Sequence, residues 1–244
     1  MLAAEQVGKG PPVVLVHGFT QTGHAWRPVT DLLAGLHTFT VVDAPGHGRS
    51  SPIRAGLWEA AGLLGATGGR AAYVGYSMGG RLCLMLALDR PDVVERLVLV
   101  SASPGIADAG AREARRTQDE RLALEIEREG VGPFLERWLA QPLFASLPRE
   151  LAQLDDRRRN SPSRLTHQLR VLGQGVQPSL WDRLGELEMP VTLVTGAYDN
   201  LYTDIARRMA ERIGTNATTV TIRGAGHAAP LEQPKDVAHV IASA

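Results

Sequence analysis

The sequence predicts an α/β protein, in which helices flank a mostly parallel sheet of about eight strands. Short apolar runs rich in β-branched residues recur along the chain, and segments with a helical pattern separate them. Runs of this kind that stop at Gly, Ser or Asp are typical of buried strands. Strands that alternate with helices form parallel sheets covered on both faces. A chain of 244 residues with 44% hydrophobic content is long enough for one such core.

The expected elements follow one another in strand–helix order. We predict strands at residues 13–16, 39–42, 71–75, 97–100, 191–196 and 218–222. We predict helices at residues 25–34, 55–66, 78–89, 201–213 and 234–243, the last of which begins at Pro234, a residue that suits a first helical turn. Residues 1–103 and 186–244 carry this pattern, so we expect them to form one core domain.

Residues 104–185 interrupt the alternation of strands and helices. They contain no convincing strand, and their Arg, Glu and Leu pattern indicates several helices. Because both flanks return to the same alternating pattern, we interpret this segment as a helical lid inserted between two strands of one sheet. A separate helical domain is the alternative interpretation.

Composition excludes several classes of partner. The 26 Lys and Arg residues balance the 26 Asp and Glu residues, so there is no bulk charge that would attract nucleic acid or an anionic membrane. The only cysteine, Cys83, lies in an apolar run, which excludes an intrachain disulfide and a zinc cluster of the Cys-x-x-Cys kind. No segment resembles a leader or a membrane span. We expect a cytoplasmic protein without metal, and its oligomeric state stays open.

The first chemical motif is Gly75-Tyr76-Ser77-Met78-Gly79, which matches the pattern Gly-x-Ser-x-Gly. It lies between a predicted strand and a predicted helix, which is the context that the pattern requires. The glycines are needed because side chains beside the serine would collide in so tight a turn, and the helix N-terminus directs N–H groups at a developing oxyanion. We predict Ser77 as the reactive group, and the alternative is a serine that only caps the helix.

Two further residues complete a catalytic set. His227 follows Gly224-Ala225-Gly226 after the last predicted strand, in a loop from which an imidazole can take the Ser77 proton. Asp199 lies just beyond the strand at 191–196, whereas its rival Asp204 falls inside the next predicted helix. The chain order Ser, Asp, His in these contexts predicts the α/β-hydrolase fold.

Backbone N–H groups that could bind an oxyanion are predicted at two places. Met78 follows the serine at the start of its helix, and Phe19 lies in His17-Gly18-Phe19, the segment that ends the first predicted strand. We expect the His17 side chain only to pack at the strand end. The segment at residues 43–50, Asp-Ala-Pro-Gly-His-Gly-Arg-Ser, is expected to shape a turn.

Over its whole length the sequence resembles the α/β-hydrolase superfamily, and the proposed lid resembles one family within it more closely. That family is the 2-succinyl-6-hydroxy-2,4-cyclohexadiene-1-carboxylate synthases of the menaquinone pathway. The resemblance lies in Ser103-Pro104-Gly105-Ile106, Arg112-Glu113-Ala114-Arg115-Arg116, Trp138-Leu139-Ala140-Gln141-Pro142-Leu143-Phe144-Ala145-Ser146-Leu147, Arg157-Arg158-Arg159-Asn160-Ser161-Pro162 and Gly173-Gln174-Gly175-Val176-Gln177-Pro178-Ser179-Leu180. The chain departs from the family pattern at Val100, Asn200-Leu201-Tyr202 and Pro230.

The resemblance implies a carbon–oxygen lyase that needs no cofactor. Its small-molecule substrate would be the polycarboxylate 2-succinyl-5-enolpyruvyl-6-hydroxy-3-cyclohexene-1-carboxylate, from which pyruvate is eliminated. The residues that match the family's substrate pocket are Tyr76, Arg81, Arg115, Trp138 and Arg157. Arginine suits such a substrate because its planar, permanently charged fork binds carboxylates in a bidentate manner.

Alternatives to these roles stay open from the residues alone. Arg115 belongs to a mixed-charge helix, a pattern that usually marks a solvated face, and Arg157 shares its run with Arg158 and Arg159. Trp138 on an apolar helix face is by default a core residue. The alternative function is a serine hydrolase of a small ester, thioester or lactone, and a non-catalytic ligand receptor on the same fold is a third possibility.

Overall fold

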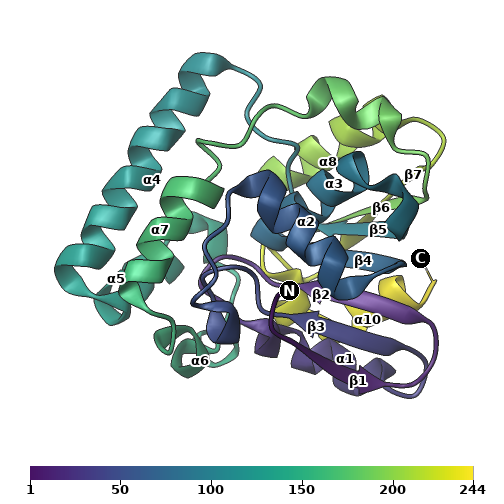
Figure 1. Cartoon of the computed structure of the whole chain (residues 1–244), viewed down its shortest axis with the longest axis horizontal. Helices are drawn as coiled ribbons and strands as arrows, with labels where there is room; N and C mark the ends of the chain where they lie inside the picture. Colours follow the sequence, from purple (N-terminus) through teal and green to yellow (C-terminus); the bar gives the residue numbers. More distant parts are fainter. Residues whose placement is uncertain (244) are drawn as a thin grey trace.

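The computed structural model describes residues 1–243 and shows seven strands in one sheet (Figure 1). The strands are β1 (Ala4–Gly8), β2 (Pro12–Val16), β3 (Thr38–Val42), β4 (Ala71–Tyr76), β5 (Val94–Val100), β6 (Val191–Gly196) and β7 (Ala217–Ile222). Their order across the sheet is β1-β3-β2-β4-β5-β6-β7, and all neighbours are parallel except β1 and β3. The mostly parallel α/β-hydrolase sheet predicted from the sequence is confirmed, with seven strands where about eight were expected.

Strand β1 is the element that the sequence pattern did not predict. Its residues, Ala-Glu-Gln-Val-Gly, pair antiparallel with β3 at one edge of the sheet, and none of them is fully buried. An edge strand whose residues are at most half-buried needs no apolar run, so it carries no periodic signal. Strand β6, which lies inside the sheet, shows the contrast, because all of its residues are buried.

Helices cover both faces of the sheet. The helices of the core are α1 (Arg27–Leu33), α2 (Leu57–Gly68), α3 (Met78–Asp89), α8 (Asn200–Ile213), α9 (Ala229–Glu232) and α10 (Pro234–Ser243). Residues of α2, α3 and α8 share one apolar cluster with the sheet, and residues of α1 and α10 share the cluster on the other face. Figure 1 shows the same two layers, with α1 and α10 on the opposite side of the strands from α2 and α3.

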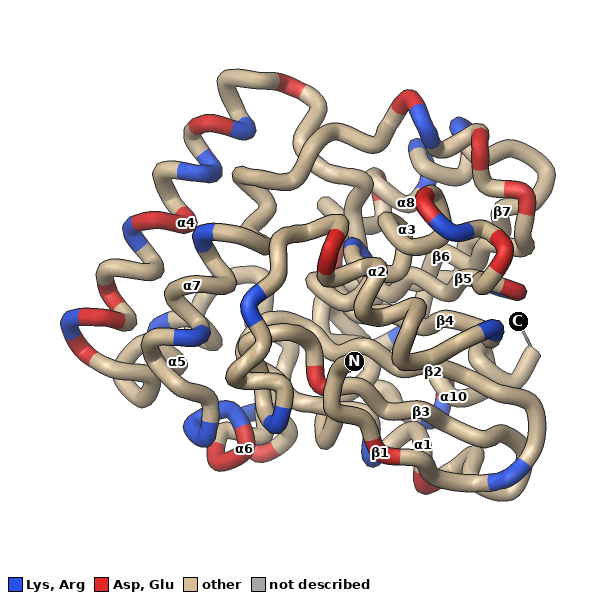
Figure 2. Tube along the Cα trace, viewed as in Figure 1, with Lys and Arg blue, Asp and Glu red and all other residues tan. Residues whose placement is uncertain are grey.

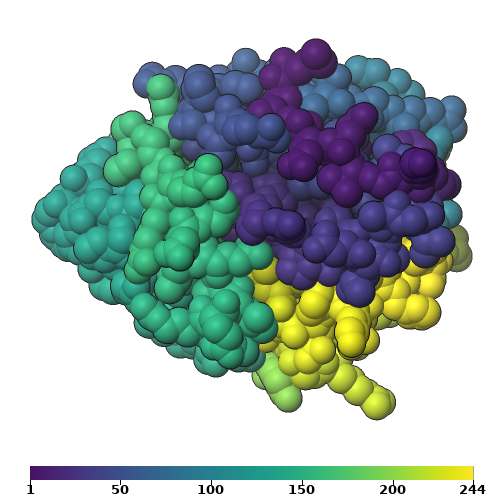
Figure 3. All heavy atoms as spheres, turned by 90° about the horizontal axis from the view of Figure 1, so that it is seen from below, coloured from purple at the N-terminus to yellow at the C-terminus, as the bar shows by residue number. Residues whose placement is uncertain are grey.

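The segment between β5 and β6 contributes helices and no strand. Its helices are α4 (Ala109–Glu129), α5 (Val131–Leu139), α6 (Leu154–Arg158) and α7 (Pro162–Leu172). They enclose a small apolar cluster of their own, which includes Ile126, Phe134 and Leu165. Figure 1 places these helices together beside the sheet, and Figure 3 shows the teal and green segment lying against the purple N-terminal segment.

The outer side of the inserted helices is strongly charged. Figure 2 shows basic and acidic residues alternating along α4 and gathered at α6. Arg170 on α7 pairs with Glu120 at 2.7 Å and with Glu127 at 2.6 Å, both on α4. Pairs of this kind fasten α7 to α4 on the solvent side, and each contributes little because water screens it. Within residues 1–243, no helix is sufficiently long and apolar to cross a membrane.

Candidate active site

Ser77 occupies the sharp turn between β4 and α3. Its backbone has φ 50° and ψ −108°, a conformation that residues with a side chain rarely adopt. A Cβ atom on Gly75 would come within 2.5 Å of the Gly79 backbone, and one on Gly79 would come within 2.2 Å of the Val16 carbonyl oxygen. The two glycines therefore let the turn close, and the strained serine is presented beyond the strand end, as the motif predicted.

His227 and Asp199 form a hydrogen-bonded chain with Ser77. The Nε2 atom of His227 lies 3.1 Å from Ser77 Oγ, and its Nδ1 atom lies 2.7 Å from Asp199 Oδ2. The other carboxylate oxygen of Asp199 accepts a hydrogen bond from the Tyr202 amide at 3.2 Å. Both His227 and Asp199 are buried. The three residues singled out in the sequence thus meet in the arrangement that moves a proton from serine to histidine.

The backbone on either side of His227 is held by a single carboxylate. Glu232 in α9 accepts the amide N–H of Gly226 at 2.9 Å and that of Ala228 at 3.0 Å. Three aromatic rings surround the imidazole, with centroids 5.5 Å away for Tyr76, 5.8 Å for Phe144 and 4.6 Å for Tyr202. The imidazole is therefore held in place by its own main chain, by Asp199 and by the aromatic rings around it.

Two buried histidines support the loop that follows β2. His17 Nε2 accepts the Ala44 amide at 3.0 Å, so its Nδ1 atom carries the proton and donates to the Gly18 carbonyl at 2.8 Å. His47 is held in the same tautomer, because its Nε2 atom accepts the Thr20 amide and its Nδ1 atom faces the Pro45 carbonyl. Burial lowers the pKa of His17, and it lowers the pKa of His47 to about 3. Both rings are therefore neutral, and each supports the loop through hydrogen bonds at both of its nitrogens.

Phe19 and Met78 lie beside Ser77 in one cavity. Within residues 1–243, neither amide N–H donates a hydrogen bond to another part of the chain. Met78 is the first residue of α3, so its N–H group also lies at the positive end of that helix. Phe19 and Met78 thus both line the cavity and both have an amide N–H without a partner within residues 1–243, as donors to a developing oxyanion would.

The cavity over Ser77 has a volume of about 180 Å³. Its wall contains Ser77 and His227 together with the five residues assigned to the pocket from the family resemblance: Tyr76, Arg81, Arg115, Trp138 and Arg157. Trp138 also packs against Phe19, Phe134 and Phe144, so it belongs to both a core cluster and the cavity wall. Leu143, Leu169 and Leu172 complete an apolar lining into which the arginines are set.

Arg81 and Arg157 are buried in this wall, and neither pairs with a carboxylate of the described residues 1–243. Arg81 is 6% exposed and donates to the Gln177 side chain at 2.8 Å and to the Leu172 carbonyl at 2.7 Å. Arg157 is 2% exposed and donates to the Ala152 carbonyl at 2.7 Å and to the Thr20 hydroxyl. Desolvation lowers the pKa of each guanidinium to about 10, which leaves both charged at neutral pH.

Arg115 is held differently. Its Nε atom donates to Asp119 Oδ1 at 2.7 Å, and its Nη1 atom donates to the Gln174 side chain at 3.0 Å. Gln174 in turn donates to the Tyr202 hydroxyl at 3.1 Å. Arg115 is thus partly neutralised within the chain, although it still lines the cavity. Arg112 and Arg116, which flank it in the sequence, are absent from the cavity wall.

Two buried side-chain amides of this region were given no role from the sequence. Gln168 lines the cavity, is 1% exposed, and has no hydrogen-bond partner for its side-chain amide within the described residues. Asn160 is buried and joins two loops of the core. Isolated amides such as these carry no distinctive spacing, so only the fold reveals their contacts. No group of three or more His, Cys, Asp or Glu side chains within residues 1–243 is placed to bind a metal ion.

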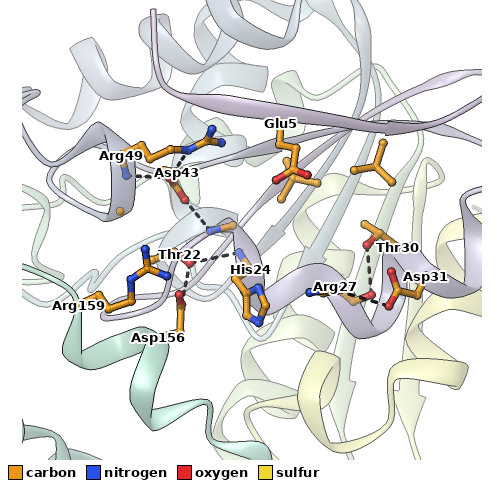
Figure 4. A pocket seen from close by; sticks show the side chains of 14 residues that line it. Glu5, Thr22, His24, Arg27, Thr30, Asp31, Asp43, Arg49, Asp156 and Arg159 are labelled. Atoms are coloured by element: carbon orange, nitrogen blue, oxygen red, sulfur yellow. Dashed lines mark hydrogen bonds and ion pairs between the residues drawn. The ribbon is translucent and has the colours of Figure 1, made fainter.

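A larger depression of about 590 Å³ lies beside the loop after β2, and Ser77 is not among the residues that line it (Figure 4). Its wall mixes both charges, and none of the residues of the Ser77 cavity belongs to it. In Figure 4, Asp43 and Asp156 point toward the loop, where Asp43 accepts the Gly23 amide and Asp156 accepts the Thr22 hydroxyl, each at 2.7 Å. These contacts hold the loop on the side that faces this depression.

Comparison with known proteins agrees with this architecture. The model of the family described as "Alpha/beta hydrolase family" matches residues 13–240. The chain belongs to the alpha/beta hydrolase family. Among members of this family, the chain is 33% identical to the 2-succinyl-6-hydroxy-2,4-cyclohexadiene-1-carboxylate synthase of Salmonella typhimurium, over 95% of this chain and 92% of the relative.

Solved alpha/beta hydrolase structures show the same fold. The chain superimposes on the structure of MenH from S. aureus with a TM-score of 0.91 and 27% identity, covering all of this chain (100%) and 97% of the other. A thermophilic esterase from Thermogutta terrifontis, solved with malate bound, gives a TM-score of 0.82 and 28% identity over 99% of this chain and 92% of the other. The likeness thus extends to the inserted helices as well as to the sheet.

Proposed function

We propose that this alpha/beta hydrolase is a carbon–oxygen lyase of menaquinone biosynthesis. Its substrate would be 2-succinyl-5-enolpyruvyl-6-hydroxy-3-cyclohexene-1-carboxylate, and its products would be pyruvate and 2-succinyl-6-hydroxy-2,4-cyclohexadiene-1-carboxylate. The similarity to the synthase of Salmonella typhimurium and to MenH from S. aureus supports this choice within the family.

The observation that carries the proposal is the pair of buried arginines beside Ser77. A buried charge without a counter-charge is unfavourable by several kcal/mol. Within residues 1–243, Arg81 and Arg157 donate only to carbonyl, hydroxyl and amide oxygens and form no ion pair. Asp119 and Asp156 act on them only from a distance, so an anion in the cavity would supply a direct counter-charge. Arg115 adds a third guanidinium on the same wall. This arrangement fits a substrate with several carboxylates better than a neutral ester.

The proposed reaction uses the triad as a base. His227, held by Asp199, takes the proton of Ser77, and the serine oxygen removes a proton from the substrate ring. The electrons of that C–H bond form a new C=C bond while the C–O bond to the enolpyruvyl group breaks. His227 then gives its proton to the departing enolate, which leaves as pyruvate, and Ser77 again carries a proton.

Negative charge that develops on the substrate during proton removal needs hydrogen-bond donors. The free N–H groups of Phe19 and Met78 serve this role in our proposal. Burial raises the pKa of Tyr76, so its hydroxyl stays protonated and is able to donate as well. We also infer that the helices of residues 104–185 form a lid, because they supply Arg115, Trp138 and Arg157 to the wall over Ser77.

The decisive experiment supplies the proposed substrate and measures pyruvate release. Wild-type protein should release one pyruvate for each substrate consumed. Ser77→Ala should lower kcat by roughly 1,000-fold or more while substrate affinity changes less than about threefold. Full turnover by the Ser77→Ala variant would exclude any mechanism that passes through this serine.

A serine hydrolase on the same triad is the competing function, and the same experiment separates the two. In a hydrolase Ser77 would attack a carbonyl and form an acyl-enzyme. Rapid cleavage of p-nitrophenyl esters combined with no pyruvate release would replace the lyase proposal by the hydrolase. Pyruvate release with slow ester cleavage would support the lyase.

A further inference from the structure

Thr20 is the most constrained residue of the loop between β2 and α1. It adopts a φ of 69°, in the left-handed region, although it carries a β-branched side chain. Its amide donates to His47 Nε2 at 3.3 Å, its hydroxyl accepts from Arg157, and its carbonyl accepts from Asn160 Nδ2 at 2.7 Å. A conformation this unfavourable persists only when its surroundings impose it. Two of the three contacts come from the inserted segment.

Asn160 lies two residues beyond α6 and joins the inserted segment to two loops of the core. Its Nδ2 atom donates to the Thr20 carbonyl, and its Oδ1 atom accepts the Gly48 amide at 3.0 Å. Asn160 is 4% exposed, and its Nδ2 atom also faces the Arg157 carbonyl at 3.3 Å. Because both ends of its carboxamide are bonded, its orientation is fixed.

A chain of hydrogen bonds runs from Asn160 to the Phe19 amide. The Thr20 carbonyl belongs to the same peptide unit as the Gln21 N–H group, which donates to the Gly18 carbonyl at 3.2 Å. The Gly18 carbonyl belongs in turn to the same peptide unit as the Phe19 N–H group. In a trans peptide the C=O and N–H bonds point in opposite directions. Holding the two carbonyls therefore sets the direction of the Phe19 N–H group.

We propose that Asn160 is a positioning residue for the oxyanion hole, acting through the relay Asn160 Nδ2–H to Thr20 C=O, Gln21 N–H to Gly18 C=O, and Phe19 N–H. The proposal rests on the role of Phe19 in the proposed function. Hydrogen bonds in series polarise one another, so the relay both orients the Phe19 N–H group and strengthens it as a donor. His17, which donates to the same Gly18 carbonyl at 2.8 Å, supports the last link from the core side.

The relay makes the inserted segment part of the oxyanion hole. The loop also contacts α6 through Thr22, whose hydroxyl donates to Asp156 at 2.7 Å (Figure 4). That contact lies outside the relay, because no hydrogen bond of Thr22 leads to the Gly18–Phe19 peptide unit. Substitutions of Thr22 and Asn160 can therefore be compared. A Thr22 variant loses only an attachment of the loop, whereas an Asn160 variant also loses the orientation of the Phe19 N–H group.

The test compares Asn160→Asp and Asn160→Ala with the control Thr22→Val. The carboxylate of the first variant is able to accept the Gly48 N–H but cannot donate to Thr20, and the second variant loses both bonds. Removing one oxyanion donor lowers kcat by roughly 100- to 1,000-fold, so misdirecting one should lower kcat by roughly 10- to 100-fold with KM within about threefold. Thr22→Val should stay within about threefold of wild type in both constants.

Two readouts keep the relay separate from the proposed lyase activity. The rate at which a fluorophosphonate modifies Ser77 depends on the oxyanion hole but not on the natural substrate, and it should fall with kcat in the Asn160 variants. The backbone amide NMR signals of Phe19 and Gln21 should shift in these variants and stay in place in Thr22→Val. If wild type reacts with the fluorophosphonate but releases no pyruvate, the lyase proposal fails while the labelling rates still decide the relay.

Labelling rates and kcat of the Asn160 variants within twofold of the Thr22→Val values would overturn the relay. If both Asn160 variants fail to fold, amide hydrogen exchange in wild type decides. A Gln21 amide that exchanges roughly 100-fold or more slower than an open loop amide supports the relay. Exchange as fast as an open loop amide contradicts it.

Discussion

Arginines at the surface of this protein and arginines beside Ser77 are held by opposite kinds of partner. Arg170 and Arg149 pair with carboxylates at 2.6–2.9 Å at the surface, where their side chains are 36% and 70% exposed. Arg81 and Arg157 are almost completely buried, yet their hydrogen bonds go to neutral oxygens. The more costly environment thus contains the less compensated charges.

This difference underlies our proposal that Arg81 and Arg157 bind the anionic substrate. A surface pair is screened by water and contributes between zero and about 1 kcal/mol, so its loss changes little. Neutral hydrogen-bond partners fix the orientation of a buried guanidinium but do not neutralise its charge. Such a guanidinium is therefore able to bind an anion. Arg115 is intermediate, because it lines the cavity and also pairs with Asp119 at 2.7 Å.

The largest effect should come from Arg157→Met. This change removes a buried charge and also leaves the Thr20 hydroxyl and the Ala152 carbonyl without their donor. We expect kcat/KM for pyruvate release to fall roughly 1,000-fold, with contributions from both constants. The control is Arg158→Met, because Arg158 is adjacent in the sequence but pairs with Glu136 and Asp155 at the surface. Similar losses in the two variants would remove the distinction between buried and surface arginines.

The second prediction extends the comparison to histidine and to pH. Burial lowers the pKa of His47 from 6.5 to about 3, so the folded protein holds it neutral while the unfolded chain binds a proton below pH 6.5. Its contribution to the free energy of unfolding is therefore complete above pH 6.5 and is lost as pH falls toward 3. Between pH values of about 7 and 5, His47 alone should account for about 2 kcal/mol of lost stability.

Urea unfolding at these two pH values measures the effect. His47→Gln should be less stable than wild type near neutral pH, because its buried ring is lost, but should lose less stability on acidification. His239, which is exposed on α10, provides the control, and His239→Gln should retain the wild-type pH dependence. An unchanged slope in His47→Gln would show that this ring is not neutral in the folded protein, or that it is not buried there.

The third prediction isolates anion binding from positioning. Arg81 makes no contact with the loop of Thr20, so Arg81→Met should act on substrate affinity alone. Hydrogen bonds to charged groups contribute about 1.5–3 kcal/mol, and we expect KM to rise roughly 10- to 100-fold with kcat within about threefold. Arg170→Met removes a surface charge and should change KM by less than about twofold. A fall in kcat that equals the rise in KM would instead assign Arg81 to the chemical step.

The sequence was most informative where regular geometry forces particular residues. The helix at Met78–Asp89 and the strand at Val191–Gly196 begin and end where they were predicted, because a glycine-bounded turn and a continuous apolar run mark their limits. Strand β1 was missed because an exposed edge strand has no such run. The positions of Ser77, Asp199 and His227, which we propose as a catalytic triad, could be predicted for the same reason as α3, since these residues follow strand ends at short, glycine-rich loops.

Other parts of the site could not be derived from the residues alone, because their roles depend on burial, and Arg157 was assigned to the pocket only by the family resemblance. Arg157 and Arg158 are neighbours in one run of arginines, and only the fold turns one inward and the other outward. Asn160 acquires its partners from residues more than 100 positions away in the chain. His17 was expected only to pack, whereas its ring connects Ala44 to the Gly18 carbonyl. Tertiary hydrogen bonds of this kind leave no periodic pattern in a single sequence.

The smallest effect should come from Glu232→Gln. Glu232 is a negatively charged group that is held by neutral N–H donors, just as Arg81 and Arg157 are positively charged groups held by neutral oxygens. Its carboxylate is held by two amide N–H groups that flank His227, and within the described part of the chain it forms no ion pair. Glu232→Gln can accept through only one oxygen, so one of the two amides loses its partner and the His227 backbone gains freedom. We expect kcat to fall roughly fivefold to tenfold with KM nearly unchanged.

The control for this prediction is Glu211→Gln, because Glu211 is an exposed carboxylate on α8 that pairs with Arg207. Its kcat should match that of wild type. The amide signals of Gly226 and Ala228 should shift only in the Glu232 variant, which ties the kinetic loss to the His227 loop. If Glu232→Gln retains full kcat while those signals move, Asp199 and the aromatic neighbours alone are sufficient to hold the imidazole. The hydrogen bonds of Glu232 to the two amides would then have no effect on His227 as a base.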